Sequence, residues 1–204
     1  MRKILHPIYV FLGHIICRIL LFKTKIYDKT HPIETDTVLF VTHPDDDTLF
    51  FHTAIKEYKP YVALMVTGWS IKRLRDFIKV MNNYGVRFRA YDTFEDGKNA
   101  EKKIINQINE VLNISDFKRV LTHNSEGEYG HRNHMRVHKC VVSNVDDVEI
   151  LVPVSENELQ QYPLPSEIVE EKTFIFNNYY LTETFVLDEY SDWVKNEKLV
   201  RYER

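Results

Sequence analysis

The chain has 204 residues and a mass of 24.4 kDa, and its 27 basic and 30 acidic side chains leave a formal charge of −3. This length, with 44% hydrophobic residues, predicts a single globular domain and excludes a disordered chain. The nearly neutral charge gives no electrostatic reason to expect nucleic acid as a partner. Cys17 and Cys140 are too few for a disulfide framework. A cytoplasmic location is therefore the default expectation.

Residues 1–34 are treated separately from the domain expected over residues 35–204, because an apolar run with basic ends opens the chain. Pro7, His14 and Arg18 interrupt this run, which argues against a membrane-spanning helix. One interpretation is an ordinary core helix that buries Ile4, Tyr9, Phe11, Ile15, Ile19 and Leu20. The second is an amphipathic helix over residues 4–22 on the inner face of a membrane, with its cations at the lipid headgroups. The third, a cleaved secretory signal, lacks a small-residue cleavage site.

From residue 35 onward, short apolar runs alternate with amphipathic ones. Helical spacing predicts helices over residues 48–57, over 71–81 with a stop at Gly85, over 104–112, and from about residue 131. This alternation predicts an α/β fold with a mostly parallel sheet covered by helices on both faces. From Ser155 the regularity fades, and we expect a loop followed by an aromatic-rich tail. The predicted strands are Thr37–Thr42, Tyr61–Thr67, Val86–Tyr91, Lys118–Thr122 and Glu149–Val154.

Two strand-to-helix loops are rich in side chains that bind metal ions. The sequence His-Pro-Asp-Asp-Asp at residues 43–47 follows the first predicted strand, and Tyr-Gly-His-Arg-Asn-His at residues 129–134 comes shortly after the fourth. Ligands of parallel α/β sheets bind at the carboxyl ends of the strands, where both loops are expected to lie.

The first loop holds three consecutive carboxylates, which repel one another unless a cation or raised pKa values compensate. A divalent metal supplies that cation, and His43 adds an imidazole of the kind that zinc prefers. The alternative is an acidic N-cap for the next helix.

In the second loop, His131 and His134 project from one face of the predicted helix, so one can bind a metal while the other transfers a proton. His43, Asp46 and His134 complete a three-ligand site, and we expect His138 to pack behind it.

The motifs HPDDD and, about 90 residues later, YGHRNH resemble those of the PIG-L/LmbE-like deacetylases. These zinc-dependent enzymes have a Rossmann-like fold and remove acetyl groups from N-acetylglucosaminyl compounds. The resemblance covers about residues 35–154, with a weaker similarity over 172–184. It implies that His43, Asp46 and His134 bind zinc or another divalent metal such as Fe²⁺, and that Asp45 is the general base.

The same resemblance implies roles for residues around the metal. His131 would stabilise the oxyanion or protonate the leaving amine, and Tyr129 would lie beside the substrate carbonyl. An arginine of the helix after the second strand contacts the sugar in several members, and Arg73 and Arg75 both lie in that stretch.

The chain departs from the family pattern in three places. Asp47 replaces the usual glutamate, which shortens a supporting side chain but removes no ligand. Asn133 stands where many members have an aspartate, and an amide stabilises an imidazolium less well than a carboxylate does, so His131 is expected to be less basic. The segment after VTGWS lacks the longer loop typical of the family, which bears on substrate specificity.

The sequence thus predicts a hydrolase that uses zinc-activated water to deacetylate an N-acetylglucosamine-type sugar, either a small molecule or lipid-linked. One alternative is a non-catalytic module that binds a sugar or nucleotide on the same fold. The other is a different single-metal hydrolase.

Overall fold

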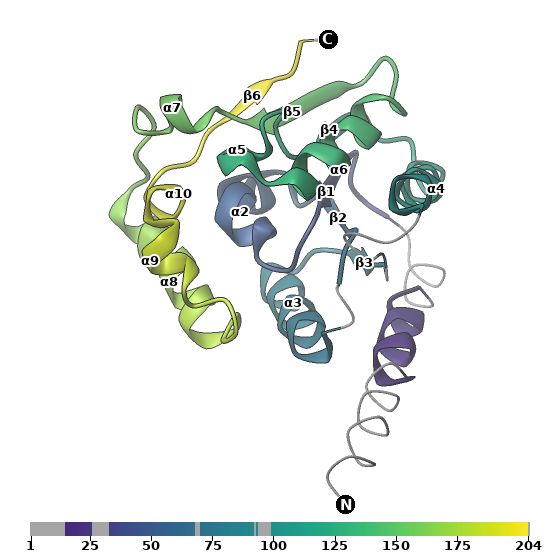
Figure 1. The fold of residues 1–204 in the computed structure, drawn as a ribbon, viewed down its shortest axis with the longest axis horizontal. Coiled ribbons are helices and arrows are strands. Elements are labelled where there is room, and N and C mark those ends of the chain that lie inside the picture. The colour runs from purple at the N-terminus through teal and green to yellow at the C-terminus, as the bar shows by residue number, and fades with distance from the viewer. Residues whose placement is uncertain (1–14, 26–32, 68–69, 92, 94–98, 204) are drawn as a thin grey trace, which may run out of the picture.

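A six-stranded sheet forms the centre of the computed structural model, which describes residues 15–25, 33–67, 70–91, 93 and 99–203 (Figure 1). The strand order is β3-β2-β1-β4-β5-β6; the first five strands are parallel, and β6 is antiparallel to β5. The α/β prediction is confirmed. The strands are β1 (Thr37–Val41), β2 (Tyr61–Leu64), β3 (Phe88–Ala90), β4 (Arg119–Leu121), β5 (Glu149–Pro153) and β6 (Leu199–Arg201).

Helices connect the strands and cover both faces of the sheet, and residues 15–25 are helical as well. Gly85 ends α3 in the left-handed conformation, with a φ of 66°, as the sequence predicts. The labelled helices are α2 (Asp46–Tyr58), α3 (Ile71–Tyr84), α4 (Ala100–Leu112), α5 (Gly127–Gly130), α6 (Arg132–Val142), α7 (Glu156–Leu159), α8 (Ser166–Asn178), α9 (Val186–Glu189) and α10 (Ser191–Lys195).

Alternate residues of the central strands enter two separate cores. Leu39 and Val41 of β1 pack on one face with side chains of α2, α3 and α8. Val38 and Phe40 pack on the other face with side chains of α4 and α6. All five residues of β1 are buried, which explains why this strand reads as a continuous apolar run and not as an alternating one.

The loop expected after Ser155 is present between α7 and α8, but the expected loss of regularity beyond it is wrong. This segment contains the 13-residue helix α8 and the edge strand β6. The core-facing side of α8 carries Lys172 beside Ile175 and Phe176, so a charged residue interrupts the apolar periodicity by which a helix is recognised.

The helix over residues 15–25 is buried on one side and exposed to solvent on the other. Ile15 and Ile19 are 39% and 51% exposed, so the core-helix interpretation is wrong for these two residues. Leu20 is partly buried, whereas residues 4, 9 and 11 lie outside the described part of the chain. Across the described residues, the helices are too short or too polar to cross a membrane.

Lys172 ties the C-terminal third of the chain to the sheet domain. Its fully buried ammonium donates to the carbonyl oxygens of Leu49 at 2.9 Å and Trp193 at 2.8 Å, and lies 3.2 Å from Oε2 of Glu197. The other oxygen of Glu197 accepts from the backbone N–H of Thr53 at 2.8 Å. Burial lowers the pKa of Lys172, although Glu197 acts in the opposite direction. This network joins α2, α8 and α10.

We expect Lys172→Met to lower the free energy of unfolding by about 3–5 kcal/mol, because it leaves the Glu197 carboxylate and two carbonyl oxygens buried without their donor. Urea denaturation followed by circular dichroism measures this loss. Lys139→Met is the matched control: Lys139 pairs with Glu101 at 3.0 Å, but its side chain is 69% exposed, so the loss there should be much smaller. Equal stabilities of the two variants would contradict the assigned role of Lys172.

Candidate metal centre

The two motif loops meet at the carboxyl ends of β1 and β4. These strands are adjacent and parallel although about 80 residues separate them. The strand order also reverses between them, because the chain runs from β1 outward to β3 and then returns to the other side of β1 at β4. Such a switch point leaves a crevice at the sheet edge in which α/β proteins bind ligands.

The side chains of His43, Asp46 and His134 converge in this crevice. Nδ1 of His43 lies 3.2 Å from Nε2 of His134, and the Asp46 oxygens lie 3.4 Å from that Nε2 and 3.6 Å from that Nδ1. Ligand atoms held about 2.0–2.1 Å from a tetrahedral zinc ion are about 3.3–3.4 Å apart. The three side chains therefore match the spacing that a zinc ion requires, and all three are buried.

Glu128 fixes the orientation of His134. One carboxylate oxygen accepts from Nδ1 of His134 at 2.6 Å and from Nδ1 of His123 at 2.9 Å, while the other accepts from the backbone N–H of Asn124 at 2.8 Å. Burial acts to raise the pKa of Glu128, but the two histidines outweigh it and lower the pKa to about 2. Because Nδ1 of His134 donates to Glu128, its Nε2 keeps a lone pair directed at His43 and Asp46.

Two further groups of potential ligands overlap this one: His43 with His131 and His134, and Asp46 with His123 and His134. The second of these groups contains His123. Its Nε2, however, accepts the backbone N–H of Thr42 at 3.0 Å, and its ring stacks on that of His134 with centroids 4.0 Å apart. Nε2 of His123 therefore already bonds to Thr42, the residue that follows β1, and the His123 ring packs behind the candidate ligands. His138 lies one layer further back, where its Nδ1 donates to the carbonyl oxygen of His123 at 2.7 Å.

Asp45 has a different environment from its neighbour Asp46. Its backbone has a φ of 112°, a strained value for a residue other than glycine, and its side chain lines the cavity. Burial, together with the Asp46 carboxylate, raises the pKa of Asp45 well above its ordinary value. Burial also acts to raise the pKa of Asp46, but His134, His123 and His43 hold it well below the ordinary value. The two adjacent carboxyl groups thus differ in proton affinity.

Asp47 points away from the candidate metal ligands. Its Oδ1 accepts the hydroxyl of Tyr180 at 2.6 Å and the backbone N–H of Asp45 at 3.3 Å, and its Oδ2 accepts the hydroxyl of Thr48 at 2.9 Å. Burial raises the pKa of Asp47 to about 6. The Asp47 carboxylate therefore stabilises the strained backbone of Asp45 by accepting its N–H.

His131 lies beside the candidate ligands, with its ring centroid 4.4 Å from that of His134. Its Nδ1 accepts the backbone N–H of Asn133 at 3.3 Å, which places the proton of the neutral ring on Nε2. The side chain of Asn133 accepts from Arg136 at 2.7 Å. Asn133 therefore contacts His131 through its backbone N–H, while its side-chain oxygen bonds to Arg136.

The cavity over these residues has a volume of about 220 Å³. Tyr129 lines it and stacks on Tyr190, with ring centroids 4.5 Å apart. Arg73 also lines it: Nε lies 2.7 Å from Glu183, and Nη2 lies 3.4 Å from Oδ1 of Asp45. Arg75 is exposed on α3 and does not line the cavity, so the structure distinguishes the two arginines that the sequence leaves as alternatives.

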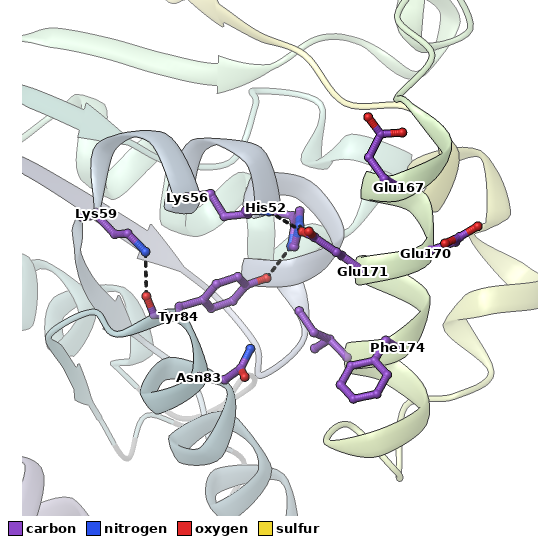
Figure 2. A pocket seen from close by; sticks show the side chains of 10 residues that line it. His52, Lys56, Lys59, Asn83, Tyr84, Glu167, Glu170, Glu171 and Phe174 are labelled. Carbon is purple, nitrogen blue, oxygen red and sulfur yellow. Dashed lines mark hydrogen bonds and ion pairs between the residues drawn. The ribbon is translucent and has the colours of Figure 1, made fainter.

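A larger cavity of about 700 Å³ lies between α2, α3 and α8. At its wall Nδ1 of His52 and the hydroxyl of Tyr84 are 2.7 Å apart, and Glu171 reaches His52 from α8 (Figure 2). The Tyr84 hydroxyl continues inward to Thr48 at 3.0 Å, so hydrogen bonds connect this wall to Asp47. The potential metal ligands are absent from its lining, and we therefore place the functional site at the smaller cavity.

Comparison with known proteins supports the fold. No family model matches the chain. An uncharacterized protein of Acanthamoeba polyphaga mimivirus is 25% identical over an alignment of 138 residues. The match covers 58% of this chain and 61% of that relative, so it spans less than two thirds of the relative's length. The crystal structure of GalB, the 4-carboxy-2-hydroxymuconate hydratase from Pseudomonas putida KT2440, gives a TM-score of 0.56 at 11% identity, covering 77% of this chain and 80% of that one.

Sequence reasoning missed several residues of this site. Glu128 directly precedes the second motif, and its glutamate type could have indicated a partner for a histidine. Tyr180, Glu183 and Tyr190 follow α8. Tyr180 and Glu183 fall within residues 172–184, where the family resemblance is weak, and Tyr190 lies beyond it.

We expect Glu128→Gln to weaken Zn²⁺ binding about 10–100-fold, because glutamine lacks the negative charge and keeps only one acceptor oxygen. Its amide nitrogen must then face either the Nδ1–H groups of His134 and His123 or the backbone N–H of Asn124. Competition with a chromophoric chelator measures this affinity. Glu126→Gln, a change at an exposed glutamate two residues earlier, should bind Zn²⁺ like the wild type. Unchanged affinity of Glu128→Gln would show that Glu128 does not position a ligand.

Proposed function

We propose that the chain is a metal-dependent amide hydrolase that deacetylates an N-acetylglucosamine-type sugar and is similar in function to the PIG-L/LmbE-like enzymes. The observation that carries the proposal is the placement of Asp45 in the cavity that His43 and Asp46 line, where these two side chains meet the buried His134. A site that only held a metal would not need a second carboxyl group with a raised pKa beside the ligands. The fold shared with GalB supports the scaffold of this proposal.

His43, Asp46 and His134 would hold the metal ion, which we propose to be zinc. When bound, zinc acts as a Lewis acid and lowers the pKa of water. Asp45 takes the proton of the attacking water, and burial raises its pKa in the direction that makes the carboxylate a stronger base. His131 supplies a proton from Nε2 to the developing oxyanion or to the departing amine. Tyr129 and Tyr190 form an aromatic wall against which a sugar ring can stack.

The charge of the cavity favours a neutral substrate. Asp45, Asp46 and Glu183 line it, whereas Arg73 is its single lysine or arginine among the described residues and already pairs with Asp45 and Glu183. A bound divalent cation would bring these charges close to balance. A neutral N-acetyl sugar fits such a cavity, whereas a carboxylate-bearing substrate would find no excess positive charge there.

Two alternatives are weighed against this proposal. A non-catalytic sugar- or nucleotide-binding module would retain the scaffold and bind the sugar without turnover. Another single-metal hydrolase, such as a phosphoesterase, would have to place an anionic phosphate among the carboxylates of the cavity. The position of Asp45 opposes the first alternative, and the charge of the cavity opposes the second.

The test is release of a primary amine from N-acetylglucosamine conjugates by the Zn²⁺-loaded protein. We expect a chelator to abolish turnover and added Zn²⁺ to restore it, with Fe²⁺ compared as a second metal. Metal binding with sugar binding but no amine release would support the binding module. Cleavage of phosphate esters without amine release would support the phosphoesterase.

Asp45→Asn should retain Zn²⁺ while lowering kcat by about 10²–10⁴-fold, because the amide cannot accept the proton of water. Metal content and amine release are measured on the same preparation. Asp188→Asn, an exposed change on α9, should leave both unchanged. Full activity of Asp45→Asn would remove Asp45 from the mechanism.

We expect Glu183→Gln to change substrate preference, because it removes the carboxylate that neutralises Arg73. The kcat/KM ratio of a carboxylate-bearing sugar such as N-acetylmuramic acid to neutral N-acetylglucosamine should rise by about tenfold. Glu189→Gln, on the exposed side of α9, is the control. An unchanged ratio would show that the Arg73–Glu183 pair does not select for charge.

A further inference from the structure

The helix over residues 15–25 has two faces of different character. One face packs on the domain: Cys17 is fully buried, Thr24 is 6% exposed, and Leu20 and Leu21 pack against the core. On the opposite face, Ile15, Ile16, Ile19 and Phe22 are 39%, 45%, 51% and 63% exposed. We call these four residues the outer apolar face. Figure 1 shows the helix, in purple, at the outer edge of the molecule beside β3 and α4.

The helix is fixed to the domain and presents this face in a defined direction. Lys25 lies 3.3 Å from Glu110 of α4, and the same carboxylate oxygen lies 2.6 Å from Arg89 of β3. Phe22 and Tyr91 line a common cavity of about 280 Å³ at the carboxyl end of β3. The outer apolar face therefore lies near the sheet edge that also carries the candidate metal centre.

Basic side chains border the outer apolar face. At 3.6 residues per turn, Ile15, Ile19 and Phe22 lie on one side of the helix, with Arg18 at one border and Lys23 at the other. Both basic residues are exposed. An exposed apolar stripe with a cation at each border is the pattern of a helix that lies in the headgroup region of an anionic bilayer.

The sequence around the helix carries the same chemistry. Residues 1–25 contain five basic side chains and no acidic one, whereas the whole chain has 27 basic and 30 acidic residues. Leu5, Ile8, Val10, Phe11 and Leu12 extend the apolar composition toward the N-terminus. A second copy of the chain on this face would bring two strongly basic segments together, whereas anionic lipid would complement them.

We propose that the outer apolar face docks on an anionic membrane surface, with Ile15, Ile16, Ile19 and Phe22 at the boundary between headgroups and acyl chains and Arg18 and Lys23 at the phosphates. The proposal depends only on this helix. Its failure would leave the proposed hydrolase activity untouched, and loss of that activity would not affect it.

Flotation of the full chain with vesicles tests the proposal. We expect binding to phosphatidylcholine vesicles that contain phosphatidylserine, much weaker binding to pure phosphatidylcholine, and a decrease as salt rises. The double variant Ile19→Ser, Phe22→Ser should lose at least about tenfold in vesicle affinity, and Lys23→Gln about fivefold. Phe174→Ser is the matched control, because Phe174 is a comparably exposed aromatic residue, at 56%, on α8.

Thermal unfolding of each variant should match that of the wild type, since the changed side chains are exposed. Absence of flotation with anionic vesicles would overturn the proposal, as would equal vesicle binding by the double variant and the wild type. A dimer in light scattering that the double variant abolishes, without vesicle binding, would instead assign the face to self-association.

Discussion

The hydrogen bond from Nδ1 of His134 to Glu128 is the interaction on which the candidate metal centre depends. It decides which nitrogen of His134 carries the proton and therefore which one faces His43 and Asp46. Glu128 accepts from His123 through the same oxygen, and His123 in turn contacts the backbone of β1 through Thr42. The ligand cluster is thus connected through buried groups to the central strand of the sheet. Such an arrangement can hold ligands in place before a metal arrives.

The same sheet edge buries an unusual density of acid groups. Asp45, Asp46, Asp47 and Glu128 are all less than a tenth exposed. An isolated buried carboxylate is unfavourable by several kcal/mol, so each needs compensation. Histidines compensate Asp46 and Glu128, hydroxyls and a backbone N–H compensate Asp47, and Arg73 faces Asp45. A divalent cation would add the positive charge that this cluster otherwise takes from imidazoles.

The C-terminal third of the chain turns the open edge of the sheet into a cavity. Lys172 anchors α8 against α2, and the segment that follows brings Tyr180 to Asp47 and Glu183 to Arg73. Tyr190 adds an aromatic ring beside Tyr129. The first two-thirds of the chain therefore provide the groups proposed for metal binding and proton transfer, whereas the last third contributes groups that would select the substrate.

The sequence by itself determined the alternation of strands and helices, the parallel sheet and the two loops that carry ligand-type residues. These features follow from local periodicity and from the general position of sites at strand ends. It also set the N-terminal apolar run with basic ends apart from the domain that follows. The choice between Arg73 and Arg75 depended on the rotation of α3 relative to the sheet, which periodicity near the helix surface does not fix.

Only the tertiary structure decided which polar groups meet across long sequence separations. The contact of His43 with His134 spans 91 residues, and that of Tyr180 with Asp47 spans 133. Helix α8 went unrecognised because Lys172 occupies a core position, where three acceptors from distant elements make a buried ammonium tolerable. Such compensation depends on partners far away in sequence, so the local pattern of apolar residues cannot predict that a lysine is buried.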